Sequence, residues 1–292
     1  MTRPLLLTGA NGRTGRAILK SLACGLIPVR VFIREEAQAD ELIALGASEY
    51  AIGDFEQPDT LASAVEGAEK VIHIGPPMYP GEFEASEELI NASIKAGVEH
   101  FIYYSVMHPL SRVIRHHRLK LEVEEALINS GLTHTILQPS RYMQHLEPIW
   151  PKVVGQGVHA MPFDVTSKFN VVDLQDLADA CAIVASSDRY HFGTYELAGP
   201  EALSQKDMAA IISDVLGRPV KAQAVPIEEM KAKARAAGAS EDRVEQMEIM
   251  NRHYDAHGFR SNAVVLECIL GRRANSYRSY VERIADEKGM EK

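Results

Sequence analysis

A glycine pattern near the start of the chain limits what this sequence can fold into. The apolar run 5–8 is followed at once by three glycines, each three residues apart, and an amphipathic segment begins at the second of them. In a strand–turn–helix unit the first glycine allows a tight turn, the second lets the backbone approach a pyrophosphate, and the third lets the helix pack closely on the strand. The pattern therefore predicts a dinucleotide site. The residues expected to bind there are Gly9, Asn11, Gly12, Arg13, Thr14 and Gly15.

The first half of the chain alternates short apolar runs with longer amphipathic stretches, which is typical of a parallel sheet covered by helices. Six strands are expected, over 4–8, 28–33, 49–52, 70–74, 100–104 and 133–138. Five helices are expected between them, over 12–23, 38–45, 59–65, 82–96 and 115–130. The predicted fold class is α/β, a doubly wound parallel Rossmann sheet.

The second half has a weaker periodicity. Its pattern predicts a helix from Leu174 to about Ser186, a strand over 194–197, a helix over 205–216 capped by Ser204, and a polar helical stretch from Ile227 to about Tyr254. We expect residues 1–150 to form the dinucleotide-binding domain. Residues 151–292 would then form a smaller C-terminal α/β substrate lobe, interleaved with the first domain and with an approximate boundary.

Composition narrows the class of partner. The formal net charge is −9, whereas a protein that reads nucleic-acid phosphates usually carries a basic face. The first residues lack an apolar run long enough for a signal peptide or a membrane span. The three cysteines have no metal-ligand spacing, and the eleven histidines form no HExxH motif. We expect a small-molecule substrate, no metal, no nucleic acid, no membrane and a cytoplasmic location; a homodimer is left open.

The residue after the second predicted strand selects between the two nicotinamide dinucleotides. An NAD enzyme commonly places Asp or Glu there to hold the ribose hydroxyls. Here the strand ends in Arg34, whose guanidinium can pair with a 2′-phosphate, and Glu35 and Glu36 follow it. NADP(H) is favoured, with either glutamate as the alternative ribose ligand. Further residues expected at the cofactor rim end the third and fourth strands: Asp54, Phe55, Gly75 and Pro76.

Several stretches resemble the NmrA-like family of atypical short-chain dehydrogenases/reductases. They are Thr8–Gly15, Leu119–Leu127, Ser130–Pro139, Val172–Ala178 and Tyr254–Gly258. The resemblance runs nearly end to end and implies an NAD(P)-binding Rossmann fold. The family contains NADPH-dependent reductases of quinones and enones, and also NADP-binding regulators that catalyse nothing.

Typical short-chain dehydrogenases use a serine and a Tyr-x-x-x-Lys pair on one helix face. In this chain Ser105 closes the fifth strand, and Lys120 follows His116 by four residues, so a histidine stands in the tyrosine position. Three roles stay open. His116 can act as the acid with help from Lys120. Lys120 can bind the ribose or shuttle the proton while His116 lines the entrance. The protein can also lack a proton donor and report the cofactor state.

The alternative without a catalytic role is that His116 and His117 form an exposed basic patch with Arg115 and Arg118. Transfer of a hydride to a quinone also needs little acid catalysis, because solvent can supply the proton.

In the family picture, the turn at Pro139 passes the nicotinamide carboxamide. Aromatic and thioether side chains that suit a flat apolar substrate follow it: Tyr142, Met143, Trp150 and Phe163. The sequence thus predicts an NADPH-dependent reductase of a small apolar carbonyl, enone or quinone. The alternative is a non-catalytic NADP(H)-sensing regulator. An epimerase of sugar nucleotides is least favoured, because the tyrosine and a polar sugar-binding set are missing.

Overall fold

The computed structural model describes residues 3–25 and 27–288, which form two compact units. The first unit comprises the chain up to Pro139 together with Gln175–Glu196. The second comprises Ser140–Leu174 together with the chain from Leu197 onward. Relative to the expected boundary near residue 150, residues 140–150 belong to the second unit and residues 175–196 belong to the first.

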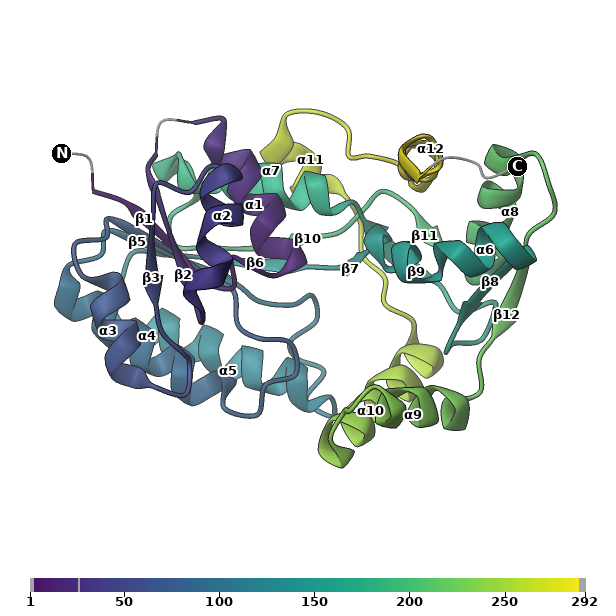
Figure 1. Cartoon of the computed structure of the whole chain (residues 1–292), viewed down its shortest axis with the longest axis horizontal. Helices are drawn as coiled ribbons and strands as arrows, with labels where there is room; N and C mark the ends of the chain where they lie inside the picture. The colour runs from purple at the N-terminus through teal and green to yellow at the C-terminus, as the bar shows by residue number, and fades with distance from the viewer. Residues whose placement is uncertain (1–2, 26, 289–292) are drawn as a thin grey trace. The chain divides into compact units, whose positions relative to one another are not determined.

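A seven-stranded sheet lies at the centre of the first unit, in the order β10-β6-β5-β4-β1-β2-β3 (Figure 1). Its strands are β1 (Leu5–Leu7), β2 (Val29–Ile33), β3 (Glu49–Ile52), β4 (Lys70–His73), β5 (His100–Tyr104), β6 (His134–Pro139) and β10 (Gly193–Leu197). The pairs from β3 across to β6 are parallel. The predicted doubly wound sheet is confirmed, but it has seven strands where we expected six. The segment 194–197 was assigned to the smaller lobe because its local pattern does not reveal which sheet it joins.

Helices cover both faces of this sheet (Figure 1). One face carries α1 (Arg13–Ala23), α2 (Ala39–Ala44) and α7 (Leu174–Ala185), and the other carries α3 (Pro58–Val65), α4 (Glu82–Ala96) and α5 (Arg115–Asn129). Two short 3-10 helices, η1 (Glu36–Gln38) and η3 (Asp188–Tyr190), complete the unit. On the second face α4 packs between α3 and α5. Since α4 and α5 are neighbours, buried polar side chains on them can meet.

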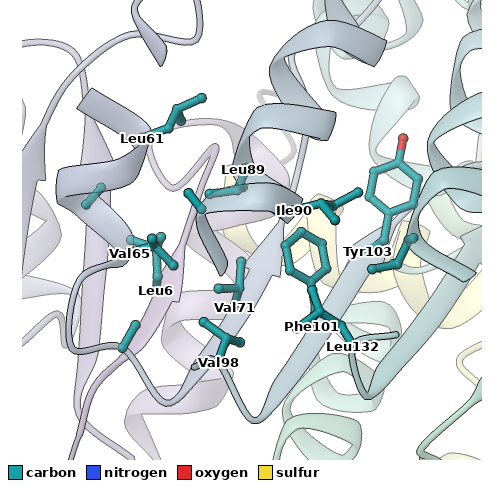
Figure 2. Close-up of a cluster of buried hydrophobic side chains, with 14 of the residues drawn as sticks. Leu6, Leu61, Val65, Val71, Leu89, Ile90, Val98, Phe101, Tyr103 and Leu132 are labelled. Atoms are coloured by element: carbon teal, nitrogen blue, oxygen red, sulfur yellow. The ribbon is translucent and has the colours of Figure 1, made fainter. Parts of the chain in front are cut away.

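Apolar side chains fill the space between the sheet and the layer α3–α5 (Figure 2). Leu6 on β1, Val71 on β4 and Phe101 on β5 face this layer, and the helices contribute side chains such as Leu89. Successive strand residues point to opposite faces of a sheet, and the neighbouring Leu5 is also fully buried. Burial of both faces explains why β1 is a continuous apolar run.

The second unit contains two small sheets, in the orders β11-β9-β7 and β12-β8. Their strands are β7 (Arg141–Tyr142), β8 (Val158–Met161), β9 (Phe169–Val172), β11 (Ala202–Leu203) and β12 (Lys221–Ala224). The helices of this unit are η2 (Met143–Ile149), α6 (Trp150–Gln156), α8 (Gln205–Leu216), α9 (Ile227–Ala236), α10 (Glu241–His257), α11 (Val264–Leu270) and α12 (Tyr277–Lys288). Within the described residues, no helix is both long and apolar enough to cross a membrane.

The helical stretch predicted from Ile227 to about Tyr254 is interrupted. Gly238 has a φ of +82°, in the left-handed region that glycine adopts without steric cost. Ser240 then caps α10 by accepting a hydrogen bond from the backbone N–H of Arg243. A left-handed glycine followed by a capping serine therefore divides one expected helix into α9 and α10.

The close approach of α1 to the turn before it depends on Gly15. A Cβ at this position would lie 2.3 Å from the carbonyl oxygen of Gly9 and 2.5 Å from Cα of Ala10. Both contacts are with backbone, so a side-chain rotation cannot relieve them. The third glycine of the pattern is thus required by packing within the turn itself.

We expect Gly15→Ala to destabilise the protein by about 1–3 kcal/mol, because the methyl group must push α1 away from the turn. The matched control is Gly155→Ala in α6, where an added Cβ meets nothing within 4 Å. That variant should be neutral or slightly stabilising, since alanine favours helix. Urea denaturation of both variants measures the difference, and equal stabilities would contradict the packing argument.

Candidate functional site

The glycine turn presents a helix N-terminus that suits an anion. Gly9 has a φ of +63°, and its carbonyl accepts a hydrogen bond from the N–H of Gly12 at 3.0 Å. Gly12 is the N-cap of α1; no side chain caps the helix, and no acidic residue lies in its first turn. Arg13 and Thr14 begin the helix. The positive end of the helix dipole therefore faces outward without a carboxylate to neutralise it, which fits a pyrophosphate.

Asn11 is exposed and is tied to the helix layer through Arg16. The Nη2 group of Arg16 donates to Oδ1 of Asn11 at 2.5 Å, and the same guanidinium pairs with Glu41 on α2. Hydrogen bonding to Glu41 raises the pKa of Arg16. Arg16 thus braces the turn against α2.

Arg34 lies just after β2 and is exposed, as are the two glutamates that follow it. Its backbone N–H donates to Oε1 of Gln38 at 3.3 Å. Glu36 accepts a hydrogen bond from the hydroxyl of Tyr50 at 3.1 Å, and this contact raises the pKa of Tyr50. Tyr50 therefore contacts one oxygen of Glu36, and the alternative that Glu36 holds the ribose stays a prediction.

The rim residues after β3 have structural partners. Oδ1 of Asp54 accepts from the backbone N–H of Glu56 at 3.1 Å. The ring of Phe55 contacts Phe32 and His73, with centroids 5.6 and 5.7 Å apart. Asp54 shapes a turn and Phe55 anchors it, so their expected role at the cofactor stays a prediction.

Lys120 on α5 is buried and forms an ion pair with a residue that the sequence did not single out. Its Nζ lies 2.6 Å from Oε1 of Glu82, at the start of α4, and 3.4 Å from the carbonyl oxygen of Tyr104. The side chains of Lys120 and Glu82 are 7% and 0% exposed. Oε1 of Glu82 also accepts from the hydroxyl of Tyr103 at 3.2 Å. A buried ion pair needs such additional hydrogen bonds, because each charge has left water.

Gly75, at the end of β4, links this pair to the predicted cofactor rim. A Cβ on Gly75 would lie 2.6 Å from Oε1 of Glu82, so the glycine leaves room for the carboxylate. Pro76 follows it in the same loop. On β4 itself, His73 contacts the hydroxyls of Thr8 and Ser86, each at 2.9 Å. Burial lowers the pKa of His73 to about 3, so this histidine is neutral at pH 7.

His116 and His117 do not belong to an exposed basic patch, which was the structural alternative to a role in catalysis. His117 is fully buried, and its Nδ1 contacts the carbonyl oxygen of His108 at 2.8 Å. The side chain of His116 is 17% exposed, and its Nδ1 lies 3.8 Å from Oε2 of Glu82. Neither of these two atoms has a hydrogen-bond partner among the described residues. Burial, and then the charge of Lys120, lowers the pKa of His116 well below its usual value, so the imidazole is neutral at pH 7.

Ser105 contacts a second carboxylate that sequence reasoning missed. Its hydroxyl donates a short hydrogen bond to Oε1 of Glu124, one turn after Lys120 on α5. Nε2 of Gln138 lies 3.0 and 2.9 Å from the two oxygens of Glu124. Burial raises the pKa of Glu124. Pro139, at the end of β6, accepts from the backbone N–H of Met107 at 2.9 Å.

The predicted catalytic residues are therefore brought together with Gly75 and Pro139 at the carboxyl ends of β4, β5 and β6, whereas Asp54 and Phe55 follow β3. Glu124 had a usable signal, because His116, Lys120 and Glu124 recur every four residues and share a helix face. Glu82 had none, since it lies 38 residues from Lys120 in an ordinary amphipathic helix. In the described part of the chain, no group of three or more His, Cys, Asp or Glu side chains is placed to hold a metal ion.

The predicted substrate residues belong to the second unit and are mostly buried. The ring of Tyr142 stacks on His145 at 5.8 Å, and Met143 is 2% exposed. Both line a cavity of that unit. Trp150 and Phe163 are 4% and 6% exposed and do not line it. For those two side chains, packing is the role that the structure describes.

Comparison with known proteins places this arrangement in a family. The model of the NmrA-like family matches residues 1–280. The chain belongs to the NmrA-like family. It is 28% identical to an NAD(P)H azoreductase of Xenophilus azovorans, over 83% of this chain and 84% of that protein. It is 27% identical to quinone oxidoreductase 2 of Escherichia coli, over 80% and 82%.

Solved structures agree with the fold of this NmrA-like chain. The triphenylmethane reductase of Citrobacter sp., complexed with NADP(H), superposes with a TM-score of 0.84 at 23% identity, over 96% of this chain and 99% of that one. NmrA, a negative transcriptional regulator in complex with NAD, gives a TM-score of 0.77 at 17% identity, over 99% and 97%. The predicted family and fold are confirmed, and the predicted NADP(H)-dependent reductase agrees with the named oxidoreductases among the relatives.

The buried ion pair predicts strong energetic coupling. Glu82→Gln and Lys120→Met should each cost about 3–5 kcal/mol, because each leaves one buried charge without its partner. The double variant should be markedly more stable than the sum of the two losses predicts. The matched control is the exposed pair Glu229–Lys233, which has the same 2.6 Å separation. Its coupling should be far smaller, since water screens it. Urea denaturation measures both cycles, and additive losses at Glu82 and Lys120 would contradict the assignment.

Proposed function

We propose that this NmrA-like protein reduces a small, apolar carbonyl, enone or quinone with NADPH. The observation that supports the proposal is that a predicted phosphate site and a buried ion pair follow two neighbouring strands of the sheet. The uncapped glycine turn ends β1, and the buried Glu82–Lys120 pair lies against Gly75, which ends the neighbouring β4. A dinucleotide bound at the carboxyl ends of these strands would contact the phosphate site with its pyrophosphate and the ammonium group of Lys120 with its ribose. The activities of the similar azoreductase and quinone oxidoreductase support the same reaction class.

The residues present fit NADPH. The turn Gly9–Gly15 would hold the pyrophosphate, and Arg34, with Arg13 in the turn, would hold the 2′-phosphate. Lys120 would hold the ribose next to the nicotinamide: an ammonium group has three N–H donors, and Glu82 and the carbonyl of Tyr104 take two of them. When bound, NADPH supplies the hydride.

Glu82 is a positioning residue in this proposal. It fixes Nζ of Lys120 from one side and accepts from Tyr103 on the other. Tyr103 does not replace the missing catalytic tyrosine. It is fully buried, and burial together with Glu82 raises its pKa well above the usual value. The hydroxyl therefore keeps its proton inside the unit.

His116 lines the entrance and does not act as the acid. A neutral imidazole is a weak proton donor, and burial keeps His116 neutral. The proton that completes the reduction comes from solvent, which suffices for acceptors such as quinones, whose reduced oxygens are stable anions. The neutral histidine is also the observation that favours the second candidate, a non-catalytic NADP(H)-sensing regulator. A reducing cytoplasm, consistent with three free cysteines, and a homodimer stay predictions.

Turnover decides between the two functions. We expect the protein to oxidise NADPH in the presence of 1,4-naphthoquinone, followed by absorbance, and enones and aldehydes complete the panel. Lys120→Met should lower kcat/KM by about a hundredfold or more, because the ribose loses its anchor. His116→Phe should retain most of the rate.

The pH profile separates the roles of His116. An acid is active when protonated, so its contribution disappears as pH rises through its pKa. Since the pKa of His116 lies well below 6.5, kcat/KM should show no His116-dependent fall between about pH 6 and 8. Such a fall would make His116 the acid. Tight binding of NADPH without turnover of any acceptor would instead favour the regulator.

Cofactor choice tests Arg34. Arg34→Ala should raise the Kd for NADPH roughly tenfold, equivalent to about 1.4 kcal/mol, and leave the Kd for NADH nearly unchanged. Arg189→Ala, at an exposed position of the same unit, controls for the loss of one positive charge. Fluorescence titration measures both constants. Equal losses for the two dinucleotides would show that Arg34 does not contact a 2′-phosphate.

A further inference from the structure

A half-buried cation lines the cavity of the second unit. Arg141 on β7 places its guanidinium carbon 4.7 Å from the ring centroid of Phe163 and 5.3 Å from that of Phe169. Its Nη2 lies 3.9 Å from Sδ of Met161. The charge thus lies over two aromatic rings, and the N–H groups of the guanidinium are the donors that could meet a ligand.

Arg141 has no carboxylate partner among the described residues. The groups that act on its charge are the neutral phenols of Tyr254 and Tyr277. Burial lowers its pKa to about 10, which still leaves the guanidinium charged at pH 7. A guanidinium that has lost part of its hydration without gaining a counter-ion is costly, and proteins ordinarily pair such a charge. The cavity therefore contains an uncompensated positive charge.

Two further polar side chains of the cavity wall each have one atom without a hydrogen-bond partner among the described residues. His159 and Gln205 are each 2% exposed and both line the cavity. Nδ1 of His159 and Oε1 of Gln205 form no hydrogen bond within the described residues. Nε2 of Gln205 is held by the carbonyl of Phe163 at 2.6 Å, which fixes the side chain. Burial, and then Arg141, lowers the pKa of His159 to about 4, so its ring is neutral and can donate one N–H.

We infer that this cavity binds the carboxylate of a flat, largely apolar molecule, with Arg141 as its counter-ion and His159 as a second donor. A carboxylate is planar and matches the in-plane donors of a guanidinium. The space within the cavity, about 20 Å³ for the centre of a water molecule, admits the carboxylate and not a whole ring. The apolar body would therefore lie outside that space, and Met143 and Met208, which line the cavity, would contact the part of it next to the carboxylate.

This assignment deepens the proposed function and rests on it where it names the substrate. An acceptor that carries a carboxylate would be favoured over its neutral analogue. The charge-bearing part of substrate recognition would then lie in the second unit, separate from the groups that hold the dinucleotide.

Calorimetry with the whole protein tests the cavity without requiring turnover. The probes are 2-naphthoate and its neutral analogue 2-naphthamide. We expect the wild type to bind 2-naphthoate at least tenfold more tightly, and Arg141→Met to abolish this preference. Arg273→Met, whose side chain is 92% exposed in the same unit, should keep it. Equal affinities for the two probes, or a preference that survives Arg141→Met, would overturn the inference.

A second variant guards against misfolding. Gln205→Glu keeps the shape of the side chain and places a carboxylate in the same cavity as Arg141. It should weaken 2-naphthoate at least tenfold and affect 2-naphthamide little. Both variants are checked by thermal melting. If Arg141→Met does not fold, unchanged binding of 2-naphthoate to folded Gln205→Glu would still refute the site.

Competition links the cavity to the acceptor and separates the two proposals. 2-Naphthoate should inhibit the reduction of 1,4-naphthoquinone competitively, whereas 2-naphthamide should inhibit it at least tenfold less. If the quinone is not reduced, the proposed function fails, and the calorimetry still decides the cavity. If the quinone is reduced but Arg141-dependent binding of 2-naphthoate does not inhibit it, the cavity is not part of the acceptor site.

Discussion

The ion pair between Glu82 and Lys120 is the interaction on which the candidate site depends. Both charges are buried, so each requires the other, and the pair in turn requires several neighbours. Tyr103 and the carbonyl of Tyr104 supply the remaining hydrogen bonds, while Gly75 leaves the space for the carboxylate. These groups come from α4, α5 and the ends of β4 and β5. The position of the ammonium group therefore depends on the packing of both helices against the sheet.

The same burial explains how a histidine can stand where typical short-chain dehydrogenases place a tyrosine. A cation at position 116 would lie near Lys120, and desolvation already opposes it, so the neutral imidazole is the stable form. In the proposed function, Lys120 then holds the ribose without a neighbouring acid. Without a protein acid, the range of acceptors is restricted, because the site favours those that take a hydride before they need a proton. Quinones and extended conjugated systems meet that condition better than simple ketones do.

The sequence predicted those features whose causes are local. The glycine turn, the helix from Arg115 and the position of Lys120 each follow from residues within a few turns of one another, and all were found. Glu82 was missed because its reason is Lys120, 38 residues further on, and nothing in its own helix distinguishes it from a solvated glutamate. The strand Gly193–Leu197 was recognised but assigned to the wrong sheet for the same reason, since pairing with β6 is decided across the fold.

Lys120, which is buried, and Arg141, which is half-buried, show two ways in which a fold can withdraw a positive charge from water. Lys120 is compensated within its own unit by Glu82, and removal of either partner should cost stability. Arg141 is surrounded by aromatic rings and by neutral side chains with open hydrogen-bonding positions. Aromatic faces offset only part of the desolvation of a guanidinium, by about 0.5–2 kcal/mol each. A charge kept in this state lowers the stability of the free protein and raises its affinity for an anion by a corresponding amount, which is the expected balance for a binding residue and not for a packing one.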